Sequence, residues 1–131
     1  MTRAEAYRRT RYRAGEVVVR VGRRSASAEA WMARHGAREA WFIGAWNPFS
    51  RQMPRRWNDA VHARLRRNLR VFEEGDGALG AWSERMLLTV ADGATILRLM
   101  RRHRQAAVVH VPRGRAARLV YGEDRPSRAR C

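Results

Sequence analysis

The chain has 131 residues, 45% of them apolar in short runs, so its length and composition exclude a second domain, overall disorder and a membrane-spanning helix. Its 28 basic and 12 acidic residues give a formal net charge of +16, which makes a polyanion the obvious partner to consider. The single cysteine, Cys131, excludes an internal disulfide, and we expect a cytoplasmic protein without a membrane partner.

The first half of the chain predicts two helices and two strands. A capping box at Thr2–Glu5 predicts a short helix at the start of an arginine-rich segment, residues 1–14. Alternating β-branched residues predict a strand over Glu16–Val21, and apolar residues at one-turn spacing predict a helix over Ala28–His35. The run Ala40–Trp46 is apolar throughout, which predicts a central strand covered on both faces.

The second half predicts two longer helices and four strands. Pro54 suits the first turn of a helix that extends to about Leu69, and Asp92 caps a helix that extends to about Arg104. The predicted strands are Val71–Glu74, Trp82–Ala91, Ala106–Val111 and Ala116–Tyr121, and the predicted turns are Gly75–Gly77 and Pro112–Arg115.

Together these elements predict an α+β fold. About three helices pack on a mixed β-sheet, in the approximate order β-α-β-α-β-β-α-β-β. We expect one domain over residues 1–121 and a disordered basic tail over residues 122–131. Apolar side chains recur every four residues from Trp57 to Leu69, so we expect Trp57, like Trp31, to lie in the core.

The polar residues that follow the predicted central strand form the first candidate site. Asn47, Ser50 and Arg51 offer an amide, a hydroxyl and a guanidinium just before a helix N-terminus, whose free amides attract anions. These groups could hold a phosphate or a carboxylate. The alternative is that Asn47 and Ser50 close a turn and cap the next helix.

Glu84 is the carboxylate best placed for acid or base chemistry, because it enters a buried strand. The alternative is an ion pair between Glu84 and a neighbouring arginine. No nucleophile elbow, paired-carboxylate motif or phosphate-binding glycine loop is present, and the four histidines lie on different predicted elements without metal-ligand spacing. The sequence therefore predicts no catalytic residue, no metal and no cofactor.

The arginines form a second candidate surface. All 28 basic residues are arginines, whose planar donors suit phosphate. Arg64, Arg67 and Arg101 belong to the two longer helices, and Tyr7 and Tyr12 lie among arginines near the N-terminus. These five side chains are candidate nucleic-acid contacts, with the tyrosines as stacking platforms. There is an alternative explanation for the use of arginine in place of lysine. A GC-rich coding sequence would exclude lysine without any selection for binding.

Several residues in these elements are shared with a known family. They are Tyr7, Thr10, Tyr12, Phe42–Ser50, Asn58, Leu65, Glu84, Gln105 and Ala106. The chain resembles the bacterial domain of unknown function 3293 family from about Tyr7 to Val111, most specifically at Ala45–Ser50, where family members look like Thr-Ala-x-Asn-Pro-x-Ser. Gly44 stands where the family usually has Thr, and Arg85 follows Glu84 where the family more often has Pro-Ser.

The resemblance implies a small single domain and no established activity, cofactor or partner. It also groups four residues into one possible cluster at strand ends, namely Asn47, Ser50, Glu84 and Gln105.

Three hypotheses for function follow. The leading one is a non-enzymatic domain that binds an anionic partner, either a small phosphate or carboxylate ligand at Asn47–Arg51 or nucleic acid on the arginine faces. The second is a small enzyme in which Glu84 is the acid or base and Asn47, Ser50 and Arg51 fix the substrate. The third is a protein–protein adaptor subunit. The sequence leaves all three open.

Overall fold

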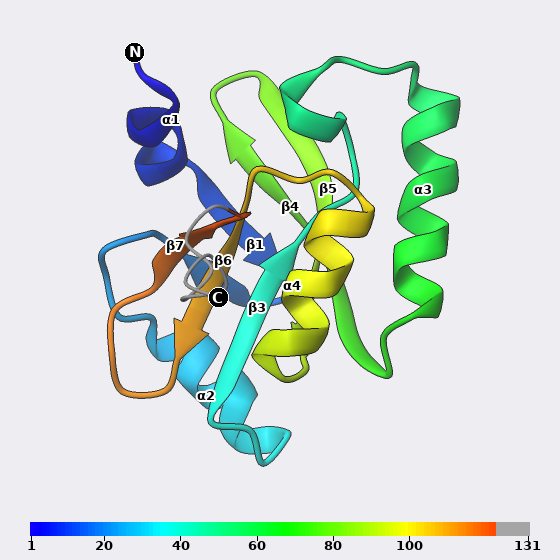
Figure 1. Cartoon of the computed structure of the whole chain (residues 1–131). Coiled ribbons are helices and arrows are strands. Elements are labelled where there is room, and N and C mark those ends of the chain that lie inside the picture. Colours follow the sequence, from blue (N-terminus) through cyan, green and yellow to red (C-terminus); the bar gives the residue numbers. More distant parts are fainter. Residues whose placement is uncertain (123–131) are drawn as a thin grey trace, which may run out of the picture.

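The computed structural model describes residues 1–122. Within them, seven strands form one antiparallel sheet in the order β2-β1-β4-β5-β3-β6-β7, with four α-helices around it (Figure 1). The elements are α1 (Arg3–Arg9), β1 (Arg11–Ala14), β2 (Val17–Val19), α2 (Ala26–Arg34), β3 (Glu39–Ile43), a 3₁₀ turn η1 (Pro48–Ser50), α3 (Arg55–Arg67), β4 (Val71–Leu79), β5 (Trp82–Val90), α4 (Gly93–Arg102), β6 (Ala107–Pro112) and β7 (Arg118–Tyr121). The expected tail, residues 122–131, lies outside the described residues except for Gly122.

β3 separates two hydrophobic cores. It lies between β5 and β6, and its residues from Ala40 to Ile43 are buried. Because successive side chains of a strand point to opposite faces, Ala40 and Phe42 enter one core and Trp41 and Ile43 enter the other. The prediction of a central strand covered on both faces is confirmed.

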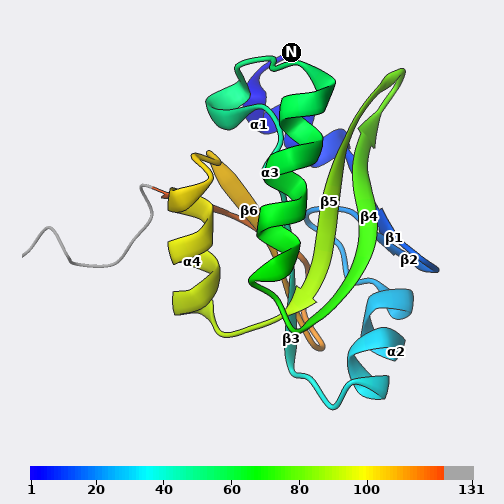
Figure 2. The ribbon, with the colours of Figure 1, turned by 90° about the vertical axis from the view of Figure 1, so that its right-hand side faces the viewer.

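Each core is closed by its own helices. Trp31 and Met32 of α2 pack into the core that contains Phe42, which we name the first core. Leu65 of α3 and Met100 of α4 pack into the second core, around Ile43. Figure 2 shows α3 and α4 on one side of the β4–β5 hairpin and α2 toward the other side. No helix among residues 1–122 is long and apolar enough to cross a membrane.

Of the two N-terminal elements, the helix α1 was predicted and the strand β1 was not. The capping box forms, with Thr2 accepting from the Glu5 amide and Glu5 from the Thr2 amide, so α1 raises the number of described helices to four. The strand β1 was not predicted: it has only two inward side chains, Tyr12 and Ala14, too few for recognisable alternation. It pairs with both β2 and β4.

The glycines of β4 lie inside the strand and do not form the predicted turn. β4 extends to Leu79, and the chain reverses at Gly80, whose φ is +61°. Gly75 lies opposite Ala14 of β1, and a Cβ at Gly75 would collide with the Arg13 carbonyl oxygen. Gly75 therefore permits β1 and β4 to approach each other closely, because glycine has no side chain to keep the strands apart.

The sheet is antiparallel rather than mixed. The β5-α4-β6 succession does join two parallel strands, but β3 lies between them and is antiparallel to both. Because the connection through α4 passes over β3, the parallel strands β5 and β6 are not neighbours, and every paired strand in the sheet is antiparallel to its neighbour. The one parallel contact within residues 1–122 is an isolated bridge between Val21 and Ala117.

Trp57 is not a core residue. It is 39% exposed, whereas Trp31 is 2% exposed. A four-residue step on an α-helix overshoots one turn by about 40°, so a stripe of strict four-residue period drifts around the helix. Leu65 lies near the middle of this stripe and is fully buried. Trp57 lies three to four turns before Leu69, at the end of the stripe that has rotated away from the core.

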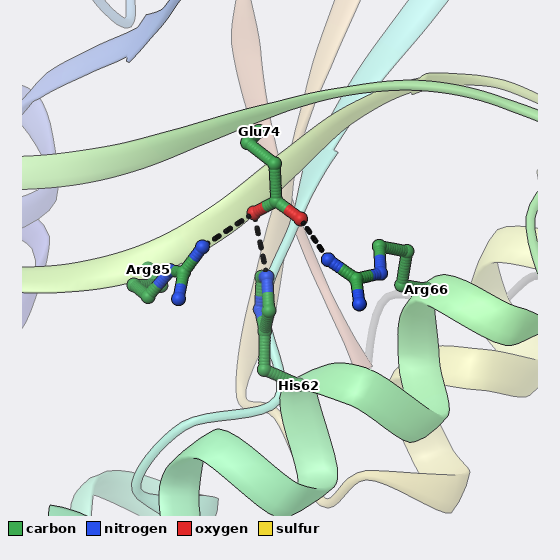
Figure 3. Close-up of polar contacts among 4 residues, drawn as sticks. All are labelled: His62, Arg66, Glu74 and Arg85. Atoms are coloured by element: carbon green, nitrogen blue, oxygen red, sulfur yellow. Dashed lines mark hydrogen bonds and ion pairs between the residues drawn. The ribbon is translucent and has the colours of Figure 1, made fainter.

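A polar stripe beside these apolar residues attaches α3 to the sheet. His62 Nε2 donates to Glu74 Oε1 at 2.8 Å, Arg66 Nη1 donates to Glu74 Oε2 at 2.8 Å, and Arg85 Nη2 donates to Glu74 Oε1 at 3.0 Å (Figure 3). His62 is 3% exposed. Partial burial opposes ionisation of Glu74, but the hydrogen bonds from His62 and Arg66 outweigh it, so the pKa of Glu74 is lowered.

The close approach of β1 and β4 is testable by glycine replacement. We expect Gly75→Ala to lower the free energy of unfolding by about 1–3 kcal/mol, because the added methyl group meets the backbone of β1. Gly44→Ala is the matched control, since the nearest atom to its Cβ lies 3.5 Å away. Urea denaturation followed by circular dichroism measures both. Equal stability of the two variants would contradict the β1–β4 register.

The Glu74 cluster predicts a pH-dependent contribution to stability. Because the folded-state pKa of Glu74 is lowered, its contribution is present above the ordinary carboxyl value of 4.5 and is lost as pH falls through the folded-state pKa. Glu74→Gln should therefore be less stable than wild type at pH 7, with a difference that shrinks in acid. Exposed Glu16→Gln is the control. A difference that is constant with pH would show that Glu74 acts only through packing.

Candidate functional site

A pocket of about 590 Å³ opens at one end of the sheet. Its walls come from α1, the turn that follows β3, the turn end of the β4–β5 hairpin and the start of β6. These segments lie together in the upper part of Figure 1. Glu84 and Met86 of β5 line the pocket, on the same face of the strand as Leu88 of the first core, so the pocket continues that core toward solvent.

Four of the five predicted ligand-binding residues line this pocket. Asn47, Ser50, Glu84 and Gln105 are separated by up to 58 positions in the sequence, and the fold brings them to one cavity. Arg51 is exposed and does not belong to the lining. The amide, hydroxyl and guanidinium of the turn therefore do not converge on one ligand.

The side chain and backbone amide of Asn47 make four hydrogen bonds. Its Nδ2 donates to Glu84 Oε2 at 2.7 Å, and its backbone amide donates to Asn58 Oδ1 at 3.0 Å. Its Oδ1 accepts from Asn58 Nδ2 and from the Met53 amide, each at 2.9 Å. The N-cap of α3 is Pro54, with no side-chain cap. Asn47 thus fixes the Glu84 carboxylate and closes the turn, since its carbonyl oxygen accepts from the Ser50 amide, but it does not cap α3.

The turn that carries Asn47 has a strained backbone. The φ angles of Asn47, Phe49 and Ser50 are +48°, +49° and +66°, in the left-handed region that costs a non-glycine residue roughly 1 kcal/mol or more. Asn58 holds this conformation at one end, and the Arg104 carbonyl oxygen holds it at the other by accepting from the Phe49 amide at 2.7 Å. Backbone strain of this kind persists where surrounding contacts over-determine it, and it concentrates at functional sites.

Glu84 is a partly buried carboxylate without an ion pair to any described residue. Burial raises the pKa of Glu84, and the hydrogen bond from Asn47 opposes that rise. Arg85 follows it in the chain but lies on the opposite face of β5, where it pairs with Glu74. Glu84 Oε1 accepts no hydrogen bond from residues 1–122, so one carboxylate oxygen is available to a ligand.

Aromatic side chains form much of the pocket wall. Tyr7, Tyr12, Trp46 and Trp82 contribute to the lining together with Phe49. Phe49 and Trp82 are 66% and 48% exposed, which is unusual for residues of this size. The rim also includes the guanidinium-bearing Arg3 and Arg55.

Gln105 contributes an acceptor to the same pocket. Its Nε2 donates to the carbonyl oxygens of Trp46 and His103, at 3.0 and 3.1 Å. Those two bonds use both protons of the amide, so the side-chain oxygen Oε1 is the group left for a ligand.

The five predicted nucleic-acid contacts are not on one surface. Tyr12 is 3% exposed and packs against Phe42 with ring centroids 5.8 Å apart, which corrects its assignment as an exposed stacking platform. Tyr7 lines the pocket. Arg64 and Arg67 line a separate groove between α3 and α4, and Arg101 does not.

Asn58 is the site residue that sequence reasoning did not select. It is 3% exposed and lies four residues before His62, so two buried polar side chains follow one another on an inward-facing side of α3. A buried polar residue requires a partner, and this spacing was the signal available in the sequence. No three histidine, cysteine, aspartate or glutamate side chains within residues 1–122 gather as metal ligands.

The burial of Glu84 predicts an effect on stability opposite to that of Glu74. A raised folded-state pKa means that ionised Glu84 destabilises the folded protein above that pKa, and that the cost is relieved as pH falls through it. Glu84→Gln keeps an oxygen for Asn47 and removes the charge, so it should be more stable than wild type at pH 7 and equal to it in acid. Denaturation at several pH values, with Glu16→Gln as control, measures this. A less stable Glu84→Gln would mean that Glu84 serves the fold.

The comparison with known protein families gives one match. A family model described as a protein of unknown function, DUF3293, matches residues 43–108, about half of the chain. The matched residues include Asn47, Asn58, Glu84 and Gln105. No curated protein and no solved structure gave a match. The chain therefore belongs to the DUF3293 family of proteins of unknown function.

Proposed function

We propose that the protein binds a small planar organic molecule in the strand-end pocket, with a cationic or hydrogen-bond-donating group of the ligand against Glu84. The observation that carries this proposal is a partly buried carboxylate with no ion pair to a described residue, in a chain with 28 basic side chains. Glu74, by contrast, is neutralised by two arginines.

The size and walls of the pocket support a ligand of this kind. A volume of about 590 Å³ falls in the range of small-molecule sites, which combine apolar walls with a few placed polar groups. Tyr7, Trp46 and Trp82 offer aromatic faces, and Glu84 and Gln105 offer acceptor oxygens. A flat molecule with N–H groups along one edge matches this set.

The hypothesis of an anionic small ligand at Asn47–Arg51 has less support than that of a cationic or hydrogen-bond-donating ligand. The Asn47 amide that would donate to an anion already donates to Glu84, and Arg51 is outside the lining. An anion beside Glu84 would also meet a like charge. An anionic substituent of the ligand would instead lie at the rim, near Arg3 or Arg55.

A small enzyme is the second candidate. The raised pKa of Glu84, a second oxygen that accepts from no donor among residues 1–122 and the fixed geometry imposed by Asn47 are the properties of a general acid or base. Ser50 is the hydroxyl on the same lining. Conversion of a bound molecule by wild type, and not by Glu84→Gln, would favour this candidate over simple binding.

An adaptor role has less support. Three of the large exposed apolar side chains lie in cavities: Phe49 and Trp82 line the pocket, and Trp57 lines the groove between α3 and α4. The exposure of these three therefore does not require a protein partner, and the others, Met1, Val18 and Phe72, lie outside both cavities.

Three ring compounds of equal shape test the charge preference of the pocket. Benzamidine carries an amidinium, benzamide a neutral amide and benzoate a carboxylate. We expect affinity in that order, in the millimolar range for fragments of this size, because Glu84 favours donors and cations. Saturation-transfer NMR and calorimetry measure the three affinities. As pH is lowered, Glu84 becomes protonated and binding of benzamidine should weaken; because the pKa of Glu84 is raised, this loss should begin at a pH above the ordinary carboxyl value of 4.5.

Two variants assign the effect to Glu84. Glu84→Gln should reduce benzamidine affinity about ten-fold or more and leave benzamide nearly unchanged, since it removes only the charge. Glu16→Gln, which lies outside the pocket lining, should change neither. Tighter binding of benzoate than of benzamidine by the wild type would overturn the proposal in favour of an anionic ligand.

A further inference from the structure

A second concave surface lies between α3 and α4. This groove, about 510 Å³ in volume, is lined by Trp57, Arg64 and Arg67 of α3, by Arg102 at the end of α4, and by His103 and Arg104 after it. Ala45 and Val61 are the buried apolar residues of its lining. Figures 1 and 2 both show α3 and α4 side by side on one face of the sheet. We name it the α3–α4 groove.

The groove is basic and not neutralised. Its four arginines come from two helices and a turn, and its lining contains no acidic residue among residues 1–122. None of the four forms an ion pair within the described part of the chain, although Arg55 and Arg66 of the same helix α3 do. Four like charges around one cavity repel one another, so an anion that enters it is stabilised by all four.

Two further features of the groove suit a ligand. Trp57 is 39% exposed at the edge of an otherwise buried stripe, which leaves an aromatic surface among the arginines. Nε2 of His103 is buried and has no hydrogen-bond partner within the described residues. Burial, Arg102 and Arg64 together lower the pKa of His103, so the ring is a neutral donor or acceptor beside the arginines.

We propose that the α3–α4 groove binds single-stranded nucleic acid, with backbone phosphates on Arg64, Arg67, Arg102 and Arg104 and one base stacked on Trp57. A basic groove that contains an aromatic platform is the common design of proteins that bind single strands without strong sequence preference. A duplex keeps its bases stacked inside and cannot offer one to Trp57. This inference is independent of the ligand proposed for the strand-end pocket, since the two cavities share no lining residue.

Fluorescence anisotropy with a labelled oligothymidylate of about 12 nucleotides tests the proposal, since single-strand sites span ~4–16 nucleotides. We expect binding at about 20–50 mM salt that weakens steeply toward about 200 mM, with a logarithmic slope near −0.7 per phosphate contacted. A duplex of the same length should bind more weakly. Absence of oligothymidylate binding at the lowest salt, or tighter binding of the duplex, would overturn the proposal.

Paired variants separate the groove from net charge. Arg64→Gln with Arg102→Gln removes two groove charges, and Arg56→Gln with Arg101→Gln removes two exposed charges of the same helices outside the groove. The groove pair should lower affinity about ten-fold or more and reduce the salt slope by about 1.4, whereas the outer pair should change affinity less than about three-fold. Equal losses for both pairs would overturn the assignment to the groove.

The stacking contact has its own variants. Trp57→Ala should lower oligothymidylate affinity about ten-fold without changing the salt slope, because stacking releases no counterions. Trp57→Phe retains an aromatic face and should recover most of that loss, and circular dichroism checks that both variants are folded. A loss that is equal in Trp57→Phe and Trp57→Ala, or a changed salt slope, would overturn the stacking role.

Discussion

The burial of β3 on both faces is the constraint on which the rest of the molecule depends. Phe42 faces one core and Ile43 faces the other, and both are completely buried, so each face of the sheet must be covered by helices. α2 covers one face, and α3 and α4 cover the other. The chain leaves this layered arrangement at the end of β3, which is where the turn Asn47–Ser50 and the pocket lie. The position of the candidate site thus follows from the packing of the central strand.

Polar contacts of α3 then determine the shape of that site. Asn58 holds Asn47 in a left-handed conformation, and Asn47 in turn holds Glu84. One turn further along α3, His62 and Arg66 bind Glu74 and fix the helix to the hairpin. The pKa values of the two carboxylates are shifted in opposite directions because their partners differ. Hydrogen bonds from His62 and Arg66, together with the charge of Arg85, lower the pKa of Glu74. Burial raises the pKa of Glu84, which has one amide donor, Asn47, among the described residues.

The arginines fall into groups with different roles. Arg13 and Arg66 pair with acidic residues of β4 and join elements of the fold, and Arg24 pairs with Glu29 in the first turn of α2. Arg64 and Arg102 form no ion pair with any residue among 1–122, and they meet in the α3–α4 groove. A preference for arginine codons would explain why lysine is absent from the chain, but it does not explain why unpaired charges from two helices share one concavity with an exposed tryptophan. The spatial grouping, more than the net charge, is the observation on which the proposed binding of single strands rests.

The sequence by itself determined the local elements, because periodicity, capping residues and glycines act over a few neighbouring positions. It determined β3, the three longer helices and the C-terminal hairpin, and through the family resemblance it grouped Asn47, Ser50, Glu84 and Gln105. Only the tertiary structure decided the pairing of β1 with β4, the exposure of Trp57, the role of Asn58 and the separation of Arg51 from the pocket. These depend on contacts between residues far apart in the chain, which no local pattern records.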